Sequence, residues 1–257
     1  MSILTVEGEP GSGKSSFLAA MAVQNMYGKA ARVARKNCNK FINELNACGY
    51  ELPRAPKHLV YADFAVTFKS PDCGVRCAWA VDGNKLGFET DKFKPQYIYP
   101  YSTIILDEAQ QYFYSRDFSS FPKNVSRWFE KHRKFGLNIY LAAQRDGLIE
   151  LNIRSLGGAI YLYNVEFKRT LSGNVKTVWQ LERWEHYRDY AGGKPGTKGT
   201  YTFDGDVRKV FETTEGRELF VPRNNTARFV AREPLNFGLS PQGILDFVKA
   251  HPQDKSY

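Results

Sequence analysis

The stretch Ser2–Ser15, SILTVEGEPGSGKS, decides the fold of this chain of 257 residues. Its first half, Ser2 to Glu7, alternates aliphatic and β-branched residues and predicts a short buried strand. Its second half, GEPGSGKS from Gly8 to Ser15, matches the pattern GxxxxGK[ST] at every fixed position. Apolar residues at helical spacing follow between Lys14 and Tyr27. A strand, a glycine-rich loop and a helix in this order predict a phosphate-binding loop, the Walker A motif of P-loop nucleoside triphosphatases.

The chemistry of this loop predicts ATP and Mg²⁺ as ligands. Glycines let successive backbone N–H groups turn inward around the β- and γ-phosphates, and the following helix directs the positive end of its dipole at the same anion. Lys14 supplies a charge that bridges these phosphates, and the Ser15 hydroxyl ligates the metal. The residues predicted to bind the nucleotide are Gly8, Glu9, Pro10, Gly11, Ser12, Gly13, Lys14, Ser15 and Ser16.

A second anchor for the metal is predicted at Asp107. The run from Ser102 to Asp107 is apolar, too short for a helix and typical of a central parallel strand. Asp107 ends this run, at the strand end where open parallel sheets place their ligand crevice. Its carboxylate is expected to anchor the metal by holding a Mg²⁺-bound water, while the adjacent Glu108 polarises the attacking water as general base. An apolar strand followed by Asp-Glu is a weak signal alone, and the upstream phosphate loop makes it specific.

Three further side chains are candidates for assisting hydrolysis. Gln144 ends the next predicted strand, Leu137 to Ala143, where an amide can position the attacking water by hydrogen bonding. Arg133 and Arg154 are candidates for an arginine finger that reaches the nucleotide of a neighbouring subunit. Arg145 is a weaker candidate for the same role, and a surface ion pair is the competing interpretation for each arginine.

The remaining pattern predicts an α/β fold: a RecA-like parallel sheet of the additional-strand type, flanked by helices, with antiparallel strands added toward the C-terminus. We expect a P-loop core at residues 1–170, with an insertion at about 69–100, and a β-rich extension with a tail at 171–257. Further helices are expected at about 32–48, at Val125–Phe135 with Gly136 as C′ residue, and at Ile244–Lys249. Further strands are expected at His58–Phe68, Ala159–Val165, Val175–Trp184, Gly199–Phe203 and Val207–Thr213.

Composition limits the class of protein. Hydrophobic residues make up 42% and charged residues 25%, which argues against wholesale disorder. The net charge of +9 favours polyanionic partners, either nucleic acid or anionic lipid headgroups. The basic stretches Arg32–Lys40 and Lys131–Lys134 could line a DNA path, or be solvated faces only. Because no signal peptide and no long apolar run is visible, we expect a cytoplasmic protein.

The motifs, in their order along the chain, resemble the zonula occludens toxin (Zot) domain. These motifs are the phosphate loop, Asp107-Glu-Ala-Gln110 after an apolar strand, the segment from His132-Arg133 through Gly136 and Ile139 to Gln144, and Ile153-Arg154. The similarity covers about residues 1–170. The family includes the gene I assembly ATPases of filamentous phages and is akin to FtsK/HerA-type motors.

The resemblance implies a Mg²⁺-dependent ATPase with Glu108 as the catalytic acidic residue and Gln144 as sensor. It also implies a role in virion assembly and extrusion at the inner membrane of the host, as a homo-oligomer, with a hexamer-like ring as the expected form. Expected partners are single-stranded DNA, phage coat or assembly proteins and a membrane-associated protein, since family members usually carry a membrane-spanning helix that is not seen here. A DNA helicase and a nucleotide-binding, toxin-like host-interaction module are the alternatives.

Overall fold

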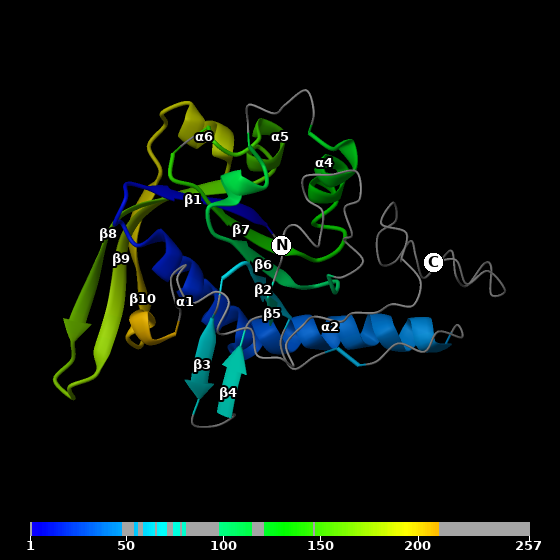
Figure 1. The fold of residues 1–257 in the computed structure, drawn as a ribbon, viewed down its shortest axis with the longest axis horizontal. Coiled ribbons are helices and arrows are strands. Elements are labelled where there is room, and N and C mark those ends of the chain that lie inside the picture. Colours follow the sequence, from blue (N-terminus) through cyan, green and yellow to red (C-terminus); the bar gives the residue numbers. More distant parts are fainter. Residues whose placement is uncertain are drawn as a thin grey trace.

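A sheet of eight strands forms the centre of the protein (Figure 1). The computed structural model describes residues 2–47, 54–55, 59–64, 66–70, 74–77, 79–80, 98–114, 121–145 and 147–210. The strands follow the order β10-β9-β8-β1-β7-β6-β2-β5, and β3 and β4 form a separate hairpin. The strands are β1 (Ile3–Gly8), β2 (Val60–Ala62), β3 (Thr67–Ser70), β4 (Gly74–Cys77), β5 (Trp79–Ala80), β6 (Thr103–Leu106), β7 (Asn138–Ala142), β8 (Gly158–Arg169), β9 (Val175–Trp184) and β10 (Thr197–Phe203).

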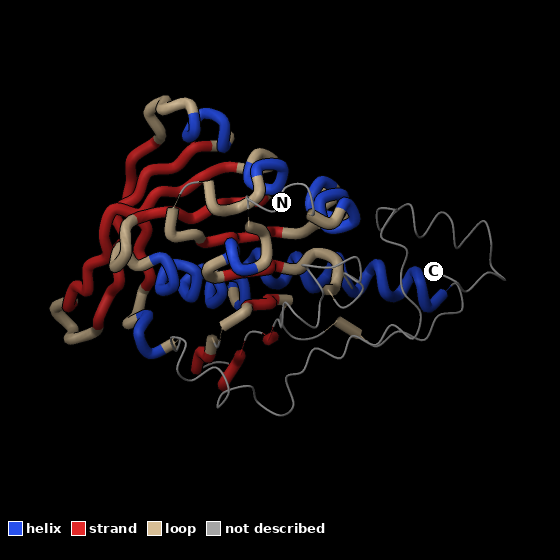
Figure 2. The backbone as a smooth tube through the Cα atoms, turned by 45° about the horizontal axis from the view of Figure 1, so that its top comes forward, coloured by secondary structure: helices blue, strands red, loops and turns tan. Residues whose placement is uncertain are grey.

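The helical elements connect and cover these strands (Figure 2). They are α1 (Lys14–Met26), α2 (Gly28–Ala47), η2 (Ala109–Gln111), α4 (Lys123–Glu130), α5 (Leu151–Arg154), α6 (Tyr187–Ala191) and η4 (Val207–Lys209). Within the ranges described above, no helix combines the length and the apolar character that a membrane crossing requires.

The parallel half of the sheet has the strand order of an additional-strand P-loop fold. The strand that leads into the phosphate loop, β1, pairs in parallel with β7, and β7 pairs in parallel with β6. One strand therefore separates the phosphate loop from the strand that ends at Asp107. Because all three run in the same direction, their carboxyl ends meet at one edge of the sheet, where ligands bind in such folds. The predicted α/β fold class is confirmed.

Apolar side chains fill a core on each face of the sheet. On one face, α1 packs against Val6, Ile105 and Ala142, and all the residues from Ser16 to Val23 are buried. On the other face, α4 and α5 pack against Ile104 and Leu141. Alternate residues of a strand point to opposite faces, so the burial of every residue of β1 and β6 reflects the covering of the sheet on both sides.

Helix α2 is amphipathic and forms an extension of the structure (Figure 1). Its buried residues, Cys38, Phe41, Ile42 and Leu45, join the core that also holds α4. Its opposite face carries the lysines and arginines of the basic stretch Arg32–Lys40. The predicted basic helix at 32–48 is therefore present, and it begins one turn earlier than expected, at Gly28.

The C-terminal strands extend the same sheet as an antiparallel unit, as the sequence predicted. β8 pairs in parallel with β1 and antiparallel with β9, and β9 pairs antiparallel with β10. The predicted boundary between residues 170 and 171 falls in the turn that joins β8 to β9. The strands on both sides of that turn belong to one sheet, and the division into two domains stays a prediction.

Three expected elements differ from the structure. The helix expected at Val125–Phe135 is regular only over Lys123–Glu130, and its C-cap is Lys131, so Gly136 is not its C′ residue. Gly136, with φ 71°, instead ends the turns that follow the helix, where its N–H donates to the Arg133 carbonyl and Leu137 N–H donates to the His132 carbonyl. The strand expected at Val207–Thr213 begins instead with the 3₁₀ helix η4. The strand expected at His58–Phe68 is interrupted between β2 and β3. The tail helix at 244–249 and most of the insertion at 69–100 lie outside the described residues.

Candidate active site

The phosphate loop leaves β1 through backbone that only glycine adopts easily. Gly8, Gly11 and Gly13 have φ values of 151°, 84° and 90°. A Cβ atom on Gly8 would lie 2.5 Å from the Leu162 carbonyl oxygen and from Ser12 Oγ. The glycines of the motif are thus required by conformation at three positions, and at Gly8 and Gly13 a side chain would also lack space.

The loop presents polar groups suited to an anion. Helix α1 begins at Lys14, and the first N–H groups of a helix have no partner within it. Ser12 is buried, and its Oγ has no hydrogen-bond partner within the described part of the chain. Exposed residues Glu9, Pro10 and Gly11 form the outer side of the loop. These unpaired donors fit the oxygens of a phosphate group.

Lys14 lies across the mouth of the loop. Its Nζ donates to the carbonyl of Gly8 at 2.7 Å and to that of Glu9 at 3.1 Å. Burial lowers the pKa of Lys14 below its ordinary value, and the nearby charges of Asp107, Glu9 and Glu108 oppose that shift. The ammonium group is therefore partly desolvated, which strengthens its attraction for a phosphate.

The two predicted metal ligands lie in contact. Ser15 Oγ donates to Asp107 Oδ2 at 2.5 Å, although 92 residues separate them in the sequence. Asp107 is oriented in turn, since its backbone N–H donates to Asp63 Oδ1 at 2.9 Å. Among the described residues no group of three or more His, Cys, Asp or Glu side chains could hold a metal. One hydroxyl and one carboxylate fit Mg²⁺, which is held by few protein oxygens together with phosphates and waters.

Glu108 occupies the next position in a strained backbone conformation. Its φ and ψ are both 47°, in the left-handed region that residues other than glycine seldom adopt. Gln111 Nε2 donates to its carboxylate at 2.6 Å, and Gln144 Nε2 approaches the other oxygen at 3.4 Å. The carboxylate of Glu108 thus lies near Gln144, just after the end of β7. Strained backbone of this kind is typical of functional sites.

The candidate arginines are placed differently from one another. Arg133 is exposed in the turns between α4 and β7, and Arg145 is exposed directly after Gln144. Arg154 is half-buried at the end of α5, where Nη1 donates to the Tyr187 hydroxyl and the guanidinium lies 4.9 Å from the centre of the Tyr187 ring. Arg154 is therefore held within its own chain by Tyr187. The role of an arginine finger stays a prediction for Arg133 and Arg154.

His132, part of the motif that resembles the Zot domain, is a core residue. It is 2% exposed, and its Nδ1 lies 2.7 Å from the Phe129 carbonyl oxygen. Its Nε2 is buried without a hydrogen-bond partner in the described ranges. A neutral ring that donates from Nδ1 satisfies this environment. Burial lowers the pKa of His132 from its ordinary value of 6.5, and the charge of Arg133 adds to the effect, while the Phe129 carbonyl opposes it.

We expect acid to destabilise the protein through His132. Because its folded-state pKa is lowered, the unfolded chain takes up this proton first as pH falls below about 6.5. The free energy of unfolding should therefore decrease below that pH and level off below the folded-state pKa. His132→Asn, which keeps a donor near the Nδ1 position, should reduce the loss of Tm between pH 7.5 and pH 5. The same substitution at exposed His186 is the control, and an equal effect of both variants would contradict a role of His132.

Sequence reasoning missed three residues that support the site. Asp63 follows β2 at the same sheet edge as Asp107, so the strand-end rule that found Asp107 could have found it as well. Gln111 is one helical turn after Glu108, and this spacing was a usable signal. Trp179 Nε1 donates to the carbonyl of Gly13 at 3.2 Å from strand β9. Nothing in the sequence pairs residue 179 with residue 13, because the contact depends on the sheet order.

The chain is similar to a known protein family and to solved structures. A sequence model of the family described as Zonular occludens toxin (Zot) matches residues 2–171. The chain is similar to the N-terminal domain of zonular occludens toxin from Neisseria meningitidis, with 18% identity and a TM-score of 0.50 over 82% of this chain and 98% of that chain. It is also similar to the genome packaging NTPase B204 from Sulfolobus turreted icosahedral virus 2 in complex with ATP-gammaS. The identity is 12% and the TM-score 0.36, and the match covers 80% of this chain and 98% of that chain. No curated protein matches the sequence.

The family match spans more than half of the chain and contains the phosphate loop, Asp107, Glu108 and Gln144. The similarity to the Neisseria domain shows that the fold is shared. The resemblance inferred from the order of the motifs is thereby confirmed. The chain belongs to the zonular occludens toxin (Zot) family.

Proposed function

We propose that this protein is an ATP-hydrolysing P-loop motor that moves or extrudes phage DNA during virus assembly. The observation that carries the proposal is the contact of Ser15 Oγ with Asp107 Oδ2 at 2.5 Å beside Lys14. It brings a hydroxyl and a carboxylate, the two oxygen ligands that P-loop enzymes use for Mg²⁺, to the end of the phosphate loop. Glu108 and Gln144 lie at the same sheet edge, which adds groups for hydrolysis to groups for binding.

The residues divide the reaction between them. The loop N–H groups and Lys14 hold the β- and γ-phosphates, and Ser15 and Asp107 would hold Mg²⁺, which neutralises charge on the phosphate oxygens when bound. Glu108 accepts a proton from the attacking water. The oxygen of that water forms a bond to the γ-phosphorus while the bond between the γ-phosphorus and the ADP oxygen breaks. Gln144 and Gln111 hold the carboxylate of Glu108 in place.

The basic face of α2 supports a nucleic acid as the cargo. The helix contains five basic residues and one acidic residue, Glu44. Lys29, Arg32, Lys36 and Lys40 follow at spacings of three and four residues, which places them along one line of the helix. This line is opposite the buried face of Cys38, Phe41, Ile42 and Leu45, and all four basic side chains are exposed.

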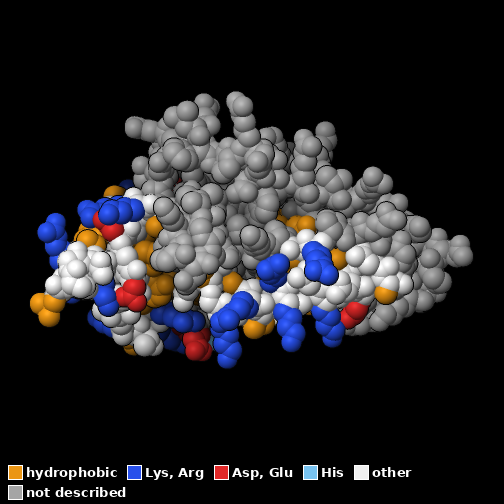
Figure 3. All heavy atoms as spheres, turned by 90° about the horizontal axis from the view of Figure 1, so that it is seen from below, with side chains coloured by type: hydrophobic (Ala, Val, Ile, Leu, Met, Phe, Trp, Pro, Cys, Tyr) orange, Lys and Arg blue, Asp and Glu red, His pale blue; other side chains and the backbone are white. Residues whose placement is uncertain are grey.

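The shape of this row fits a phosphate backbone better than a membrane. It covers about 17 Å of helix, at about 1.5 Å per residue. Figure 3 shows lysine and arginine side chains lined up along the face where α2 lies. The apolar face of α2 is already packed on the core, so the helix has no wide apolar surface to place in lipid.

Removing charge from this row should weaken binding of single-stranded DNA. We expect the variant Arg32→Gln/Lys36→Gln/Lys40→Gln to bind an unstructured oligonucleotide more weakly, because each lost cation no longer displaces a counterion. The dependence of log K on log salt should become shallower by about 2, at about 0.7 per phosphate contact on single strands. Fluorescence anisotropy at several salt concentrations measures both quantities. DNA-stimulated ATP turnover should fall, while turnover without DNA stays at the wild-type value.

A matched control removes the same charge elsewhere. Lys168, Lys176 and Lys194 are exposed and each lies within 2.9 Å of a carboxylate, so Lys168→Gln/Lys176→Gln/Lys194→Gln should bind DNA like the wild type. Equal loss in both variants would mean that net charge alone attracts DNA. Unchanged binding by the α2 variant would remove α2 from the DNA surface, and duplex unwinding would favour a helicase.

We also propose that the active form is a homo-oligomer at the inner membrane of the host. This part rests on the family resemblance, which implies a ring and an assembly role with phage coat proteins or a membrane-associated partner. Arg133 is better placed than Arg154 to reach a neighbouring subunit. Arg133 is exposed in the turns before β7, whereas Arg154 is bound to Tyr187 of its own chain.

A further inference from the structure

The antiparallel extension closes directly on the phosphate loop. Val165 of β8 and Trp179 of β9 are cross-strand partners in the β8–β9 ladder. A Cβ atom on Gly13 would lie 2.8 Å from Val165 Cγ1 and 3.0 Å from Trp179 Nε1. These two side chains therefore pack directly against the last glycine of the loop. Strand β9, which carries Trp179, lies beyond the residues matched by the family model.

Trp179 also makes polar contacts with the loop. The side chain is completely buried, and its Nε1 lies 3.2 Å from the Gly13 carbonyl oxygen and 3.3 Å from Ser16 Oγ. The same carbonyl accepts from Phe17 N–H at 2.8 Å and from Ser16 Oγ at 2.8 Å. Three donors from two distant parts of the chain thus fix one carbonyl of the phosphate loop.

The position of this carbonyl controls a donor to the nucleotide. The Gly13 carbonyl and the Lys14 N–H belong to one peptide group, and in a trans peptide they point in opposite directions. Holding the carbonyl toward β9 consequently turns the Lys14 N–H away from β9, at the first position of α1, where it has no partner within the helix. This N–H is among the donors that a bound phosphate needs.

We propose that Trp179 is a positioning residue for ATP binding: its indole fixes the Gly13 carbonyl and so orients the Lys14 N–H toward the phosphates. The proposal rests on the proposed ATPase function. In this role Trp179 acts through the backbone of the loop and does not touch the nucleotide. The C-terminal strands are accordingly part of the nucleotide site.

A bulge in β8 allows Val165 to reach the loop. The register of β8 on β9 shifts between Leu162 and Asn164, so Tyr163 is the extra residue. If residues 162–165 formed a regular strand without the bulge, Leu162 and Val165 would lie three positions apart and would point to opposite faces of the sheet, because side chains alternate along a strand. With it, both pack in the core that contains α1. The bulge is therefore the local feature that adapts the strand to the phosphate loop.

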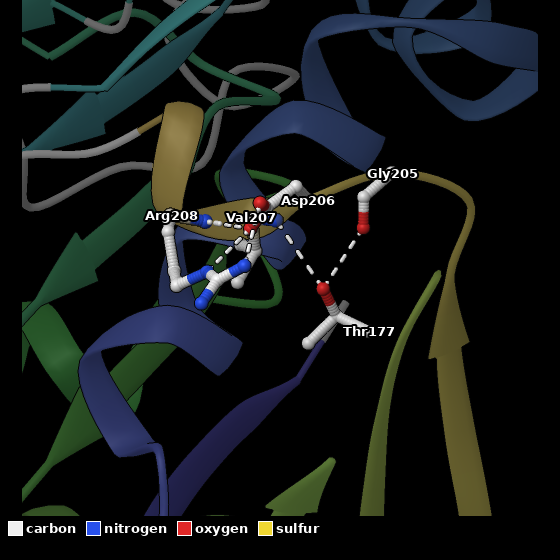
Figure 4. Close-up of polar contacts among 5 residues, drawn as sticks. All are labelled: Thr177, Gly205, Asp206, Val207 and Arg208. Carbon is white, nitrogen blue, oxygen red and sulfur yellow. Dashed lines mark hydrogen bonds and ion pairs between the residues drawn. The ribbon is translucent and has the colours of Figure 1, made fainter. Parts of the chain in front are cut away.

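The chain after β10 holds β9 in this position. Thr177, two residues before Trp179, donates through Oγ1 to the Gly205 carbonyl at 2.8 Å, and Val207 N–H donates to Thr177 Oγ1 at 3.2 Å (Figure 4). Val207 is fully buried in the core with α1. The ion pair of Asp206 with Arg208, at 2.8 Å, closes the 3₁₀ turn. These contacts fix strand β9 next to α1.

Aromatic packing fixes the indole itself. The Trp179 ring meets Phe17 of α1 edge-on at 5.7 Å between centroids, and Tyr201 of β10 at 5.7 Å. Because phenylalanine can keep much of this packing, Trp179→Phe chiefly removes the N–H donor. The strand offers a matched control in Trp184, whose Nε1 donates to the Lys194 carbonyl at 2.7 Å, away from the loop.

The test compares Trp179→Phe with Trp184→Phe. Each loses one indole donor to a carbonyl, and Tm is measured for both to show that they are folded. We expect Trp179→Phe to bind Mg·AMPPNP about tenfold more weakly in calorimetric titration, since two hydrogen bonds that order the loop are lost. Trp184→Phe should bind like the wild type.

Each result decides the proposal. A folded Trp179→Phe protein with wild-type affinity overturns it, and so does an equal loss of affinity in Trp184→Phe. If Trp179→Phe does not fold, half-buried Val165→Ala decides instead: weaker binding is expected, because the space beside Gly13 opens, and unchanged affinity overturns the proposal. Absence of binding by the wild type would contradict the ATPase function itself, so the two failures are distinguishable.

Discussion

Replacing Lys14 with alanine should abolish ATP hydrolysis, with kcat/KM at least about 100-fold below the wild-type value. Lys14 Nζ lies over the loop, held by the carbonyls of Gly8 and Glu9, and it is the cation of the Walker A motif. Its partial burial makes its charge act through a medium less polar than water. Release of inorganic phosphate at varied Mg·ATP concentrations measures the change, and calorimetric titration shows whether binding is lost with it.

Lys123→Ala is the control for this experiment. Lys123 is an exposed lysine at the start of α4, so its loss removes the same charge without touching the loop. Both variants should fold, because neither side chain is part of an apolar core. Wild-type kcat/KM in Lys14→Ala would remove Lys14 from the phosphate site and contradict the assignment of the loop.

The phosphate site could be predicted from the sequence because its parts are local. Conformation forces the glycines at 8, 11 and 13, and the chain passes from strand to helix within the same short stretch. Asp107 could be predicted because a P-loop needs a second oxygen ligand for its metal, and an acid at the end of an apolar parallel strand lies at the edge of the sheet where that ligand is required. In the structure Asp107 lies against Ser15, a contact across 92 positions that the motifs implied.

The support of the site could not be predicted because it depends on which strands are neighbours. The pattern at Val175–Trp184 predicted β9 with its observed bounds, but it did not show which element β9 would cover. The bulge at Tyr163 and the contact of Trp179 with Gly13 follow from the pairing of β8 with both β1 and β9. His132 belongs to the same motif as Gln144, but it is a buried residue of the core.

Replacing Glu108 with glutamine should separate binding from hydrolysis. We expect kcat to fall by about 10²- to 10⁴-fold, because the amide cannot accept the proton of the attacking water. The affinity for Mg·AMPPNP should stay near the wild-type value, since Lys14, Ser15 and Asp107 are untouched. A single-turnover assay measures hydrolysis and calorimetric titration measures affinity. Glu130→Gln, at an exposed acid of α4, is the control and should be fully active.

The backbone of Glu108 provides a second way to examine the same role. A residue other than glycine in this left-handed conformation costs on the order of 1–3 kcal/mol of folding free energy. Glu108 at this position therefore lowers the stability of the protein. Glu108→Gly relieves that strain and removes the carboxylate, and it should be inactive with a Tm no lower than that of Glu108→Gln. Loss of activity with an unchanged Tm would show that the hydrolysis step is impaired and that folding is not. Turnover in Glu108→Gln within about threefold of the wild type would instead favour a module that binds nucleotide without using Glu108 as a base.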